Sequence, residues 1–210
     1  MTALISTLFT MCPAKAHEDA RFFSVSPGFF LMTLWFGFSC GWRVLGLVLT
    51  AALVHEGGHW LALCLMGGRP KSLCLGMMGA VMEIDTLQLS YGREWLVTVA
   101  GPVANLAAAM VLSVIGGGLW SAWAGANVVL AIYNLVPLRP LDGGRALYLA
   151  SARWLGPDGG EALVRWSGTV FGLAAAAGLI FLVEKTGGSL WLLLTAAGLC
   201  AAVAKEWQKE

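Results

Sequence analysis

Charged residues are scarce in this chain of 210 residues, in which Lys, Arg, Asp and Glu together make up only 12%. Soluble domains carry about 25%, whereas 58% of the residues here are hydrophobic. The 13 basic and 12 acidic residues nearly cancel, and no basic run stands out, which argues against nucleic acid as a partner. The composition therefore indicates an integral membrane protein whose main surroundings are the lipid bilayer.

Cysteine and histidine are also sparse. The five cysteines are scattered and form no C-x-x-C pair, so they predict apolar packing residues rather than a disulfide framework or a thiolate metal site. There are three histidines, and two of them, His55 and His59, stand in one short motif. A third, His17, lies near the start of the chain.

The motif His55-Glu56-Gly57-Gly58-His59 lies in an apolar run, 44–66, whose only formal charge is Glu56. In a chain of this composition roughly 0.002 such matches are expected by chance. On a helix, residues four apart share a face, so both imidazoles can reach one zinc ion and Glu56 can reach a water beside it. Ionisable groups in a membrane segment usually serve a function. The alternative is a purely structural pair of histidines that form hydrogen bonds with neighbouring polar groups.

Six hydrophobic runs are long enough to cross a bilayer, which takes about 20 residues each. They lie at 28–42, 44–66, 94–118, 122–150, 165–183 and 188–204. The run 122–150 is broken by Pro137 and Pro140, and broken backbone at membrane depth requires surrounding protein or a water-filled cavity. The sequence thus predicts an all-α polytopic fold with about six transmembrane helices and a polar cavity at the proline break.

The organisation follows from these runs. We expect a juxtamembrane arm (1–27), one membrane domain (28–204) and a short tail (205–210); cleavage after a signal-peptidase-like site at 14–16 is an alternative for the arm. With six spans and a cytoplasmic N-terminus, 11 of the 13 basic residues face the cytoplasm. Both termini should then be cytoplasmic, and the site should lie nearer the cytoplasmic side.

A short apolar segment, 71–85, follows the second run and is interrupted by Gly76 and Gly79. It is too short to span as a helix. The glycines favour a membrane-associated β-hairpin whose free edge could hold an extended substrate. An amphipathic surface segment is the alternative.

A third metal ligand is needed, because catalytic zinc normally has three protein ligands and one open position. Asp142 is the best candidate: it follows the proline break, and Gly143-Gly144 beside it permit close backbone approach. His17 is a weaker candidate, since it lies well before the first run. Asp142 could instead form a local ion pair with Arg139 or Arg145.

Three motifs together resemble those of the site-2 protease family of intramembrane zinc metalloproteases. They are His55 to His59, Gly101-Pro102-Val103-Ala104-Asn105, and Asn134-x-x-Pro137-x-x-Pro140-Leu141-Asp142-Gly143-Gly144. Their order and spacing match over about residues 22–204. The six-run layout without a PDZ insertion looks most like the sporulation branch, which implies a membrane-tethered pro-sigma factor as substrate and leaves room for an inhibitory membrane protein partner.

The chemistry requires a base, a metal and a donor to the carbonyl oxygen. One Zn²⁺ per chain, held by His55, His59 and Asp142, would activate water, and Glu56 would accept its proton. The resemblance implies Asn134 as the oxyanion donor. Asn105 is a second candidate, for positioning the substrate; interhelical hydrogen bonding is the alternative for both asparagines.

The expected function is thus that of a zinc metalloendopeptidase acting on a peptide bond in or beside a transmembrane segment. Two other classes remain open. A membrane metal carrier could use the same ligands for transit, although it usually needs a row of sites. A catalytically inert scaffold could hold a structural metal, although structural zinc sites generally use four protein ligands.

Overall fold

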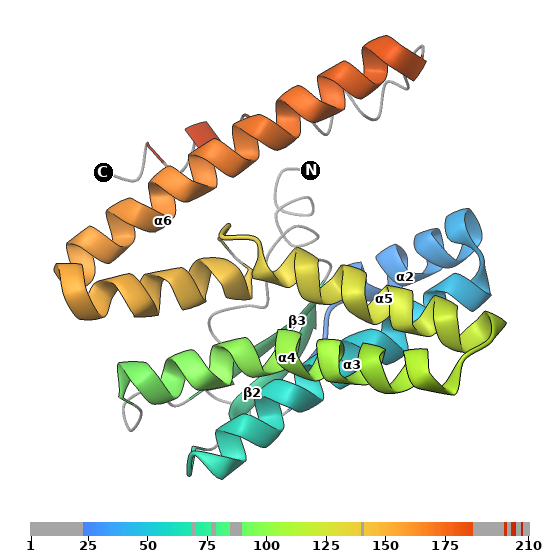
Figure 1. Cartoon of the computed structure of the whole chain (residues 1–210), viewed down its shortest axis with the longest axis horizontal. Coiled ribbons are helices and arrows are strands. Elements are labelled where there is room, and N and C mark those ends of the chain that lie inside the picture. The colour runs from blue at the N-terminus through green and yellow to red at the C-terminus, as the bar shows by residue number, and fades with distance from the viewer. Residues whose placement is uncertain are drawn as a thin grey trace. The chain divides into compact units, whose positions relative to one another are not determined.

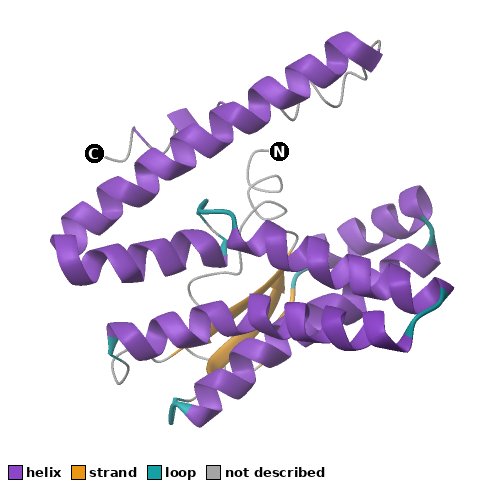
Figure 2. Ribbon diagram, viewed as in Figure 1, coloured by secondary structure: helices purple, strands orange, loops and turns teal. Residues whose placement is uncertain are grey.

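The structure is a computed structural model, and it describes residues 23–68, 70–76, 79–84, 90–139 and 141–186, together with 200, 203, 204 and 207. The elements in chain order are β1 (Phe23–Val25), α2 (Pro27–Cys40), α3 (Trp42–Leu65), β2 (Pro70–Gly76), β3 (Gly79–Ile84), α4 (Tyr91–Ile115), α5 (Gly118–Leu135) and α6 (Asp142–Thr186). Helices dominate these residues (Figures 1 and 2), as the composition predicts.

Three of the described helices, α3, α4 and α6, are long and apolar enough to cross a membrane. The shorter α2 is also apolar and ends at Gly41, whose φ of 91° turns the chain into α3. The expected run 165–183 lies wholly within α6, after a kink at Gly156. The run 188–204 falls almost entirely outside the described residues, so the count of six spans and the division into arm, membrane domain and tail stay predictions.

The chain forms two compact units, Met1–Ala131 and Ile132–Glu210. In the first unit, α3 and α4 pack along each other (Figure 1). Buried positions on these helices include small or polar residues such as Ala51 and Asn105, whereas Val114 is 87% exposed. Small and polar residues inside with large apolar residues outside are typical of helices whose surroundings are lipid.

The segment after α3 forms the predicted hairpin. Strands β2 and β3 pair in antiparallel register, with Gly76 opposite Gly79 at the turn and an irregularity near Pro70. Strand β1 adds to the other side of β2 in parallel register, which makes a three-stranded sheet of order β1-β2-β3 (Figure 2). The sequence did not indicate β1, because its pairing partner lies about 50 residues away.

The proline break is present in the second unit. The run expected at 122–150 is divided between α5 and the first part of α6, with residues 136–141 between the two helices. The Ser167 hydroxyl donates to the Pro137 carbonyl at 3.0 Å, and Arg139 pairs with Glu161. A Cβ on Gly144 would lie 2.6 Å from the Leu138 carbonyl oxygen, so the Gly143-Gly144 pair does permit close backbone approach.

One expectation about cysteine is wrong. Cys40, Cys64 and Cys200 are free thiols among the described residues, but Cys74 is disulfide-bonded. Disulfide pairing depends on which cysteines meet in the fold, and the scattered spacing does not carry that information.

Candidate metal centre

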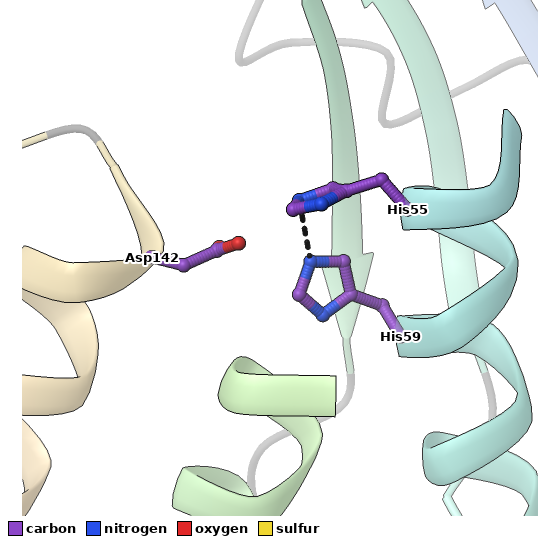
Figure 3. Close-up of side chains that lie close together, drawn as sticks. All are labelled: His55, His59 and Asp142. Atoms are coloured by element: carbon purple, nitrogen blue, oxygen red, sulfur yellow. Dashed lines mark hydrogen bonds between the residues drawn. The ribbon is translucent and has the colours of Figure 1, made fainter. Parts of the chain in front are cut away.

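The two motif histidines lie on one face of α3, one turn apart. Their rings meet edge to face with centroids 4.7 Å apart, and the two Nε2 atoms are 3.2 Å apart (Figure 3). His55 is buried and His59 is partly buried. The helix is apolar along its length, so the imidazoles are the main polar groups on this face.

Helix α4 orients His59 through its main chain. His59 Nδ1 lies 2.8 Å from the Val97 carbonyl oxygen. A carbonyl can only accept, so Nδ1 carries the hydrogen and Nε2 presents a lone pair. Such a partner on the second ring nitrogen is the usual arrangement for a metal-binding histidine.

Helix α4 orients His55 through a side chain. His55 Nδ1 lies 2.7 Å from Oδ1 of Asn105, a residue with 0% exposure. The Asn105 amide nitrogen donates to the Ala51 carbonyl oxygen at 2.9 Å, which assigns Oδ1 to the histidine side. His55 therefore also carries its hydrogen on Nδ1 and presents the Nε2 lone pair.

Two glycines allow the helices to approach this closely. A Cβ on Gly58 would lie 2.6 Å from both the Ala100 carbonyl oxygen and the Ala104 Cβ, and a Cβ on Gly101 would overlap the His59 ring. Gly57, by contrast, has nothing within 4 Å. Gly58 and Gly101 thus set the distance at which α4 holds the histidines.

The spacing of the two Nε2 atoms fits a shared metal ion. Two lone pairs that face each other at 3.2 Å repel unless a cation lies between them. Two nitrogens on a tetrahedral zinc ion, each at about 2.05 Å, stand about 3.3 Å apart. The imidazole pair therefore fits zinc in both donor chemistry and distance; a shared proton is the competing explanation.

The other predicted site residues lie on three elements. Asp142 is the first residue of α6 and is partly buried. Asp142 belongs to the second compact unit, whereas His55 and His59 belong to the first. Glu56 follows His55 on α3, and Asn134 lies in the last turn of α5; both are partly buried. His17 lies outside the described residues.

Asn105 and Asn127 show what reasoning from the sequence missed. Asn105 was expected to position substrate, and that role stays a prediction, whereas its observed contact is with His55. Asn127 on α5 was not singled out, although it is fully buried and accepts a hydrogen bond from Asn105 at 2.8 Å. The sequence feature that could have identified Asn127 is its position as an asparagine within an apolar run.

Comparison with solved structures gives the class of fold. No family model matches the sequence. The structure resembles the site-2 protease from Methanocaldococcus jannaschii with a TM-score of 0.63, over 90% of this chain and 92% of that one. The sequence identity is 20%, so the likeness concerns the fold.

Sequence relatives carry the comparison further. A Synechocystis protein named as a zinc metalloprotease is 28% identical over 110 residues, which cover 48% of this chain and 29% of that protein. Stage IV sporulation protein FB of Bacillus subtilis is 30% identical over 115 residues, which cover 51% of this chain and 40% of that protein. The matches therefore span less than half the length of either relative. Together with the fold, they confirm the resemblance to the site-2 protease family of intramembrane zinc metalloproteases.

Proposed function

We propose that this protein is an intramembrane zinc endopeptidase. One observation carries the proposal: His55 and His59 present two Nε2 lone pairs 3.2 Å apart on a helix that is apolar enough to cross a membrane. A metal site in such a helix is costly to maintain and therefore points to chemistry rather than to packing. The names of the relatives support a zinc protease.

The metal in this proposal is one zinc ion per chain, held by His55, His59 and Asp142. The paired Nε2 atoms of the two histidines and the motif that contains Asp142 support that ligand set. Two neutral imidazoles and one carboxylate are a common catalytic zinc set and leave a coordination position for water. Bound zinc supplies Lewis-acid polarisation of the scissile carbonyl and increases the acidity of water.

In this proposal, one residue of the chain transfers the protons and another stabilises the developing charge. Glu56, which follows a ligand on α3, accepts the proton of the attacking water and passes it to the leaving amine. Asn134 donates an amide hydrogen to the carbonyl oxygen as negative charge develops there. Both assignments rest on the motif spacing and on the resemblance.

The proposed substrate is a membrane-tethered protein cut in or beside its transmembrane segment. Its helix must unwind locally, because a regular helix shields its carbonyls. An outer strand of the β1-β2-β3 sheet could hold the unwound segment by main-chain hydrogen bonds. Similarity to a stage IV sporulation protein supports a membrane-tethered transcription factor precursor, such as a pro-sigma factor, as the substrate. An inhibitory membrane protein is a further proposed partner.

The decisive test uses Glu56→Gln in the full chain, co-expressed with a panel of membrane-tethered pro-sigma precursors. We expect cleavage to fall by roughly 100-fold or more, since general-base catalysis contributes about that much, while about one zinc per chain remains bound. Glu94→Gln, the same substitution in the first turn of α4, is the matched control and should cleave normally.

Two further outcomes separate the competing functions. If the wild type shortens no precursor but moves zinc across vesicle membranes, the chain is a carrier; if it binds zinc and does neither, it is a scaffold. Asp142→Ala should hold less zinc than the wild type in the same preparations. Unchanged zinc content in that variant would remove Asp142 from the ligand set.

A further inference from the structure

Two fully buried asparagines form a chain of hydrogen bonds that ends on His55. Asn105 on α4 and Asn127 on α5 are both 0% exposed. The Asn105 amide nitrogen donates to the Ala51 carbonyl oxygen at 2.9 Å and to Asn127 Oδ1 at 2.8 Å. The Asn127 amide nitrogen donates to the Trp123 carbonyl oxygen at 3.0 Å.

The hydrogen bonds that link Asn127, Asn105 and His55 can run in only one direction. The Ala51 and Trp123 carbonyls only accept, so each must face an amide nitrogen. Asn127 therefore turns its Oδ1 toward Asn105, and Asn105 turns its Oδ1 toward His55. Of the two neutral forms of the ring, an acceptor at that point allows only the Nδ1–H form, in which the lone pair lies on Nε2.

His55 and His59 are thus held in the same form by different means. The Val97 main-chain carbonyl suffices for His59. For His55 the acceptor is a side-chain amide, which could rotate by half a turn and present its nitrogen instead. Asn127 prevents that rotation, because a turned Asn105 would point Oδ1 at two acceptors, Ala51 O and Asn127 Oδ1.

We propose that Asn105 and Asn127 are positioning residues that lock His55 in the Nδ1–H tautomer and so present Nε2 to the metal. The inference rests on the proposed zinc site and adds a residue, Asn127, that touches neither metal nor substrate. It also makes the zinc affinity depend on α5, a helix that supplies no ligand in the proposed set. If the two amides served only to join the helices by hydrogen bonds, zinc affinity would not depend on Asn127.

Zinc affinity is the first measurement, made by chelator competition on the full chain in detergent micelles. Replacing a residue that orients a zinc ligand typically lowers affinity 10–100-fold, and we expect about that loss for Asn105→Leu and about 10-fold for Asn127→Leu. Asn127→Ser should recover part of the loss, because a helical serine can donate to the carbonyl four residues earlier, as Ser151 does to Leu147. A loss in Asn105→Leu with unchanged affinity in Asn127→Leu would overturn the role of Asn127.

Thr98→Val is the matched control. Thr98 is a buried hydroxyl residue of α4 that bonds its own helix, at the Glu94 carbonyl oxygen. Its replacement removes a buried polar group of the same helix without touching the amide chain. Zinc affinity should therefore be that of the wild type. An equal loss in Thr98→Val and Asn127→Leu would mean that any buried polar deletion loosens the site, and it would overturn the proposal.

The tautomer itself is the second measurement, and it needs neither zinc nor cleavage. Nitrogen-15 chemical shifts of labelled histidine in the zinc-free protein distinguish the two ring forms. We expect His55 in the wild type to be in the Nδ1–H form and Asn127→Leu and Asn105→Leu to show a mixture. A mixture already in the wild type would contradict this inference without contradicting the proposed protease function. A wild type with a single tautomer but no zinc affinity would contradict the proposed protease function alone.

Discussion

At the residue scale, His59 depends on a neighbour without a side chain. Its imidazole lies against the α-carbon of Gly101 on α4, where any Cβ would overlap the ring. The motif around Gly101 and Pro102 thus leaves room for the imidazole of His59, a proposed metal ligand. Pro102 is buried beside it within α4, so this stretch of helix is closely packed.

Gly101→Ala tests that dependence. The new methyl must displace the His59 ring, because the backbone of α4 is fixed by its packing on α3. We expect at least a 10-fold loss of zinc affinity with the chain still inserted in the membrane. Gly125→Ala on α5 is the control, since a Cβ there meets nothing within 4 Å and affinity should not change. Wild-type affinity in Gly101→Ala would show that His59 is not a ligand in its observed position.

The residues proposed to carry the chemistry could be named from the sequence because the pattern that identifies them is local. His55, Glu56 and His59 follow from helical spacing and from the cost of burying charge. The hydrogen-bond partner of His55 could not be named in the same way. Asn105 and Asn127 lie 50 and 72 positions away along the chain, and only packing of α3, α4 and α5 brings the three side chains into line.

At the element scale, only one of the two adjacent glycines of the His55 to His59 motif contributes to the close crossing of α3 and α4. Gly58 faces α4, whereas Gly57 beside it faces open space. Close crossings at small residues are a usual means of packing helices in membranes. The two neighbouring glycines therefore offer a matched pair of substitutions on one helix.

We expect Gly58→Ala to lower stability by about 1–3 kcal/mol, because the methyl would press on the Ala100 carbonyl and the Ala104 side chain. Gly57→Ala should be neutral or stabilising by up to about 1 kcal/mol, since alanine favours the helix. Thermal unfolding of both variants in one detergent gives the comparison. An equal gain in stability in both variants would mean that helix propensity, and not the crossing, governs this region.

Elements with local signals were predicted and those with remote partners were not. The β2–β3 hairpin follows from Gly76 and Gly79, and the break after α5 follows from Pro137 and Pro140. Strand β1 escaped notice because three residues carry little pattern and the partner strand is remote. The run 122–150 was treated as one span because hydropathy does not register the break in the helix at its prolines.

At the scale of the whole molecule, the distribution of basic residues predicts the orientation in the membrane. Cytoplasmic loops are enriched in Lys and Arg, and the connection from α4 to α5, at Gly116 and Gly117, carries no charge. A connection of that kind is expected on the outer side. The basic residues at 205 and 209 agree with the prediction of a cytoplasmic C-terminus.

Reporter fusions test this orientation directly. Alkaline phosphatase inserted at Gly117 should be active and green fluorescent protein there dark, while the reverse is expected for fusions after Glu210. Both reporters are needed, since each is silent on the side where the other works. The Gly117 fusion gives the direction of α4, and the two fusions together show whether the number of crossings after α4 is odd, as three further spans require. Phosphatase activity at Glu210 as well as at Gly117 would mean an even number of crossings after α4, and the expected set of six would then be wrong even if the proposed metal ligands on α3 were right.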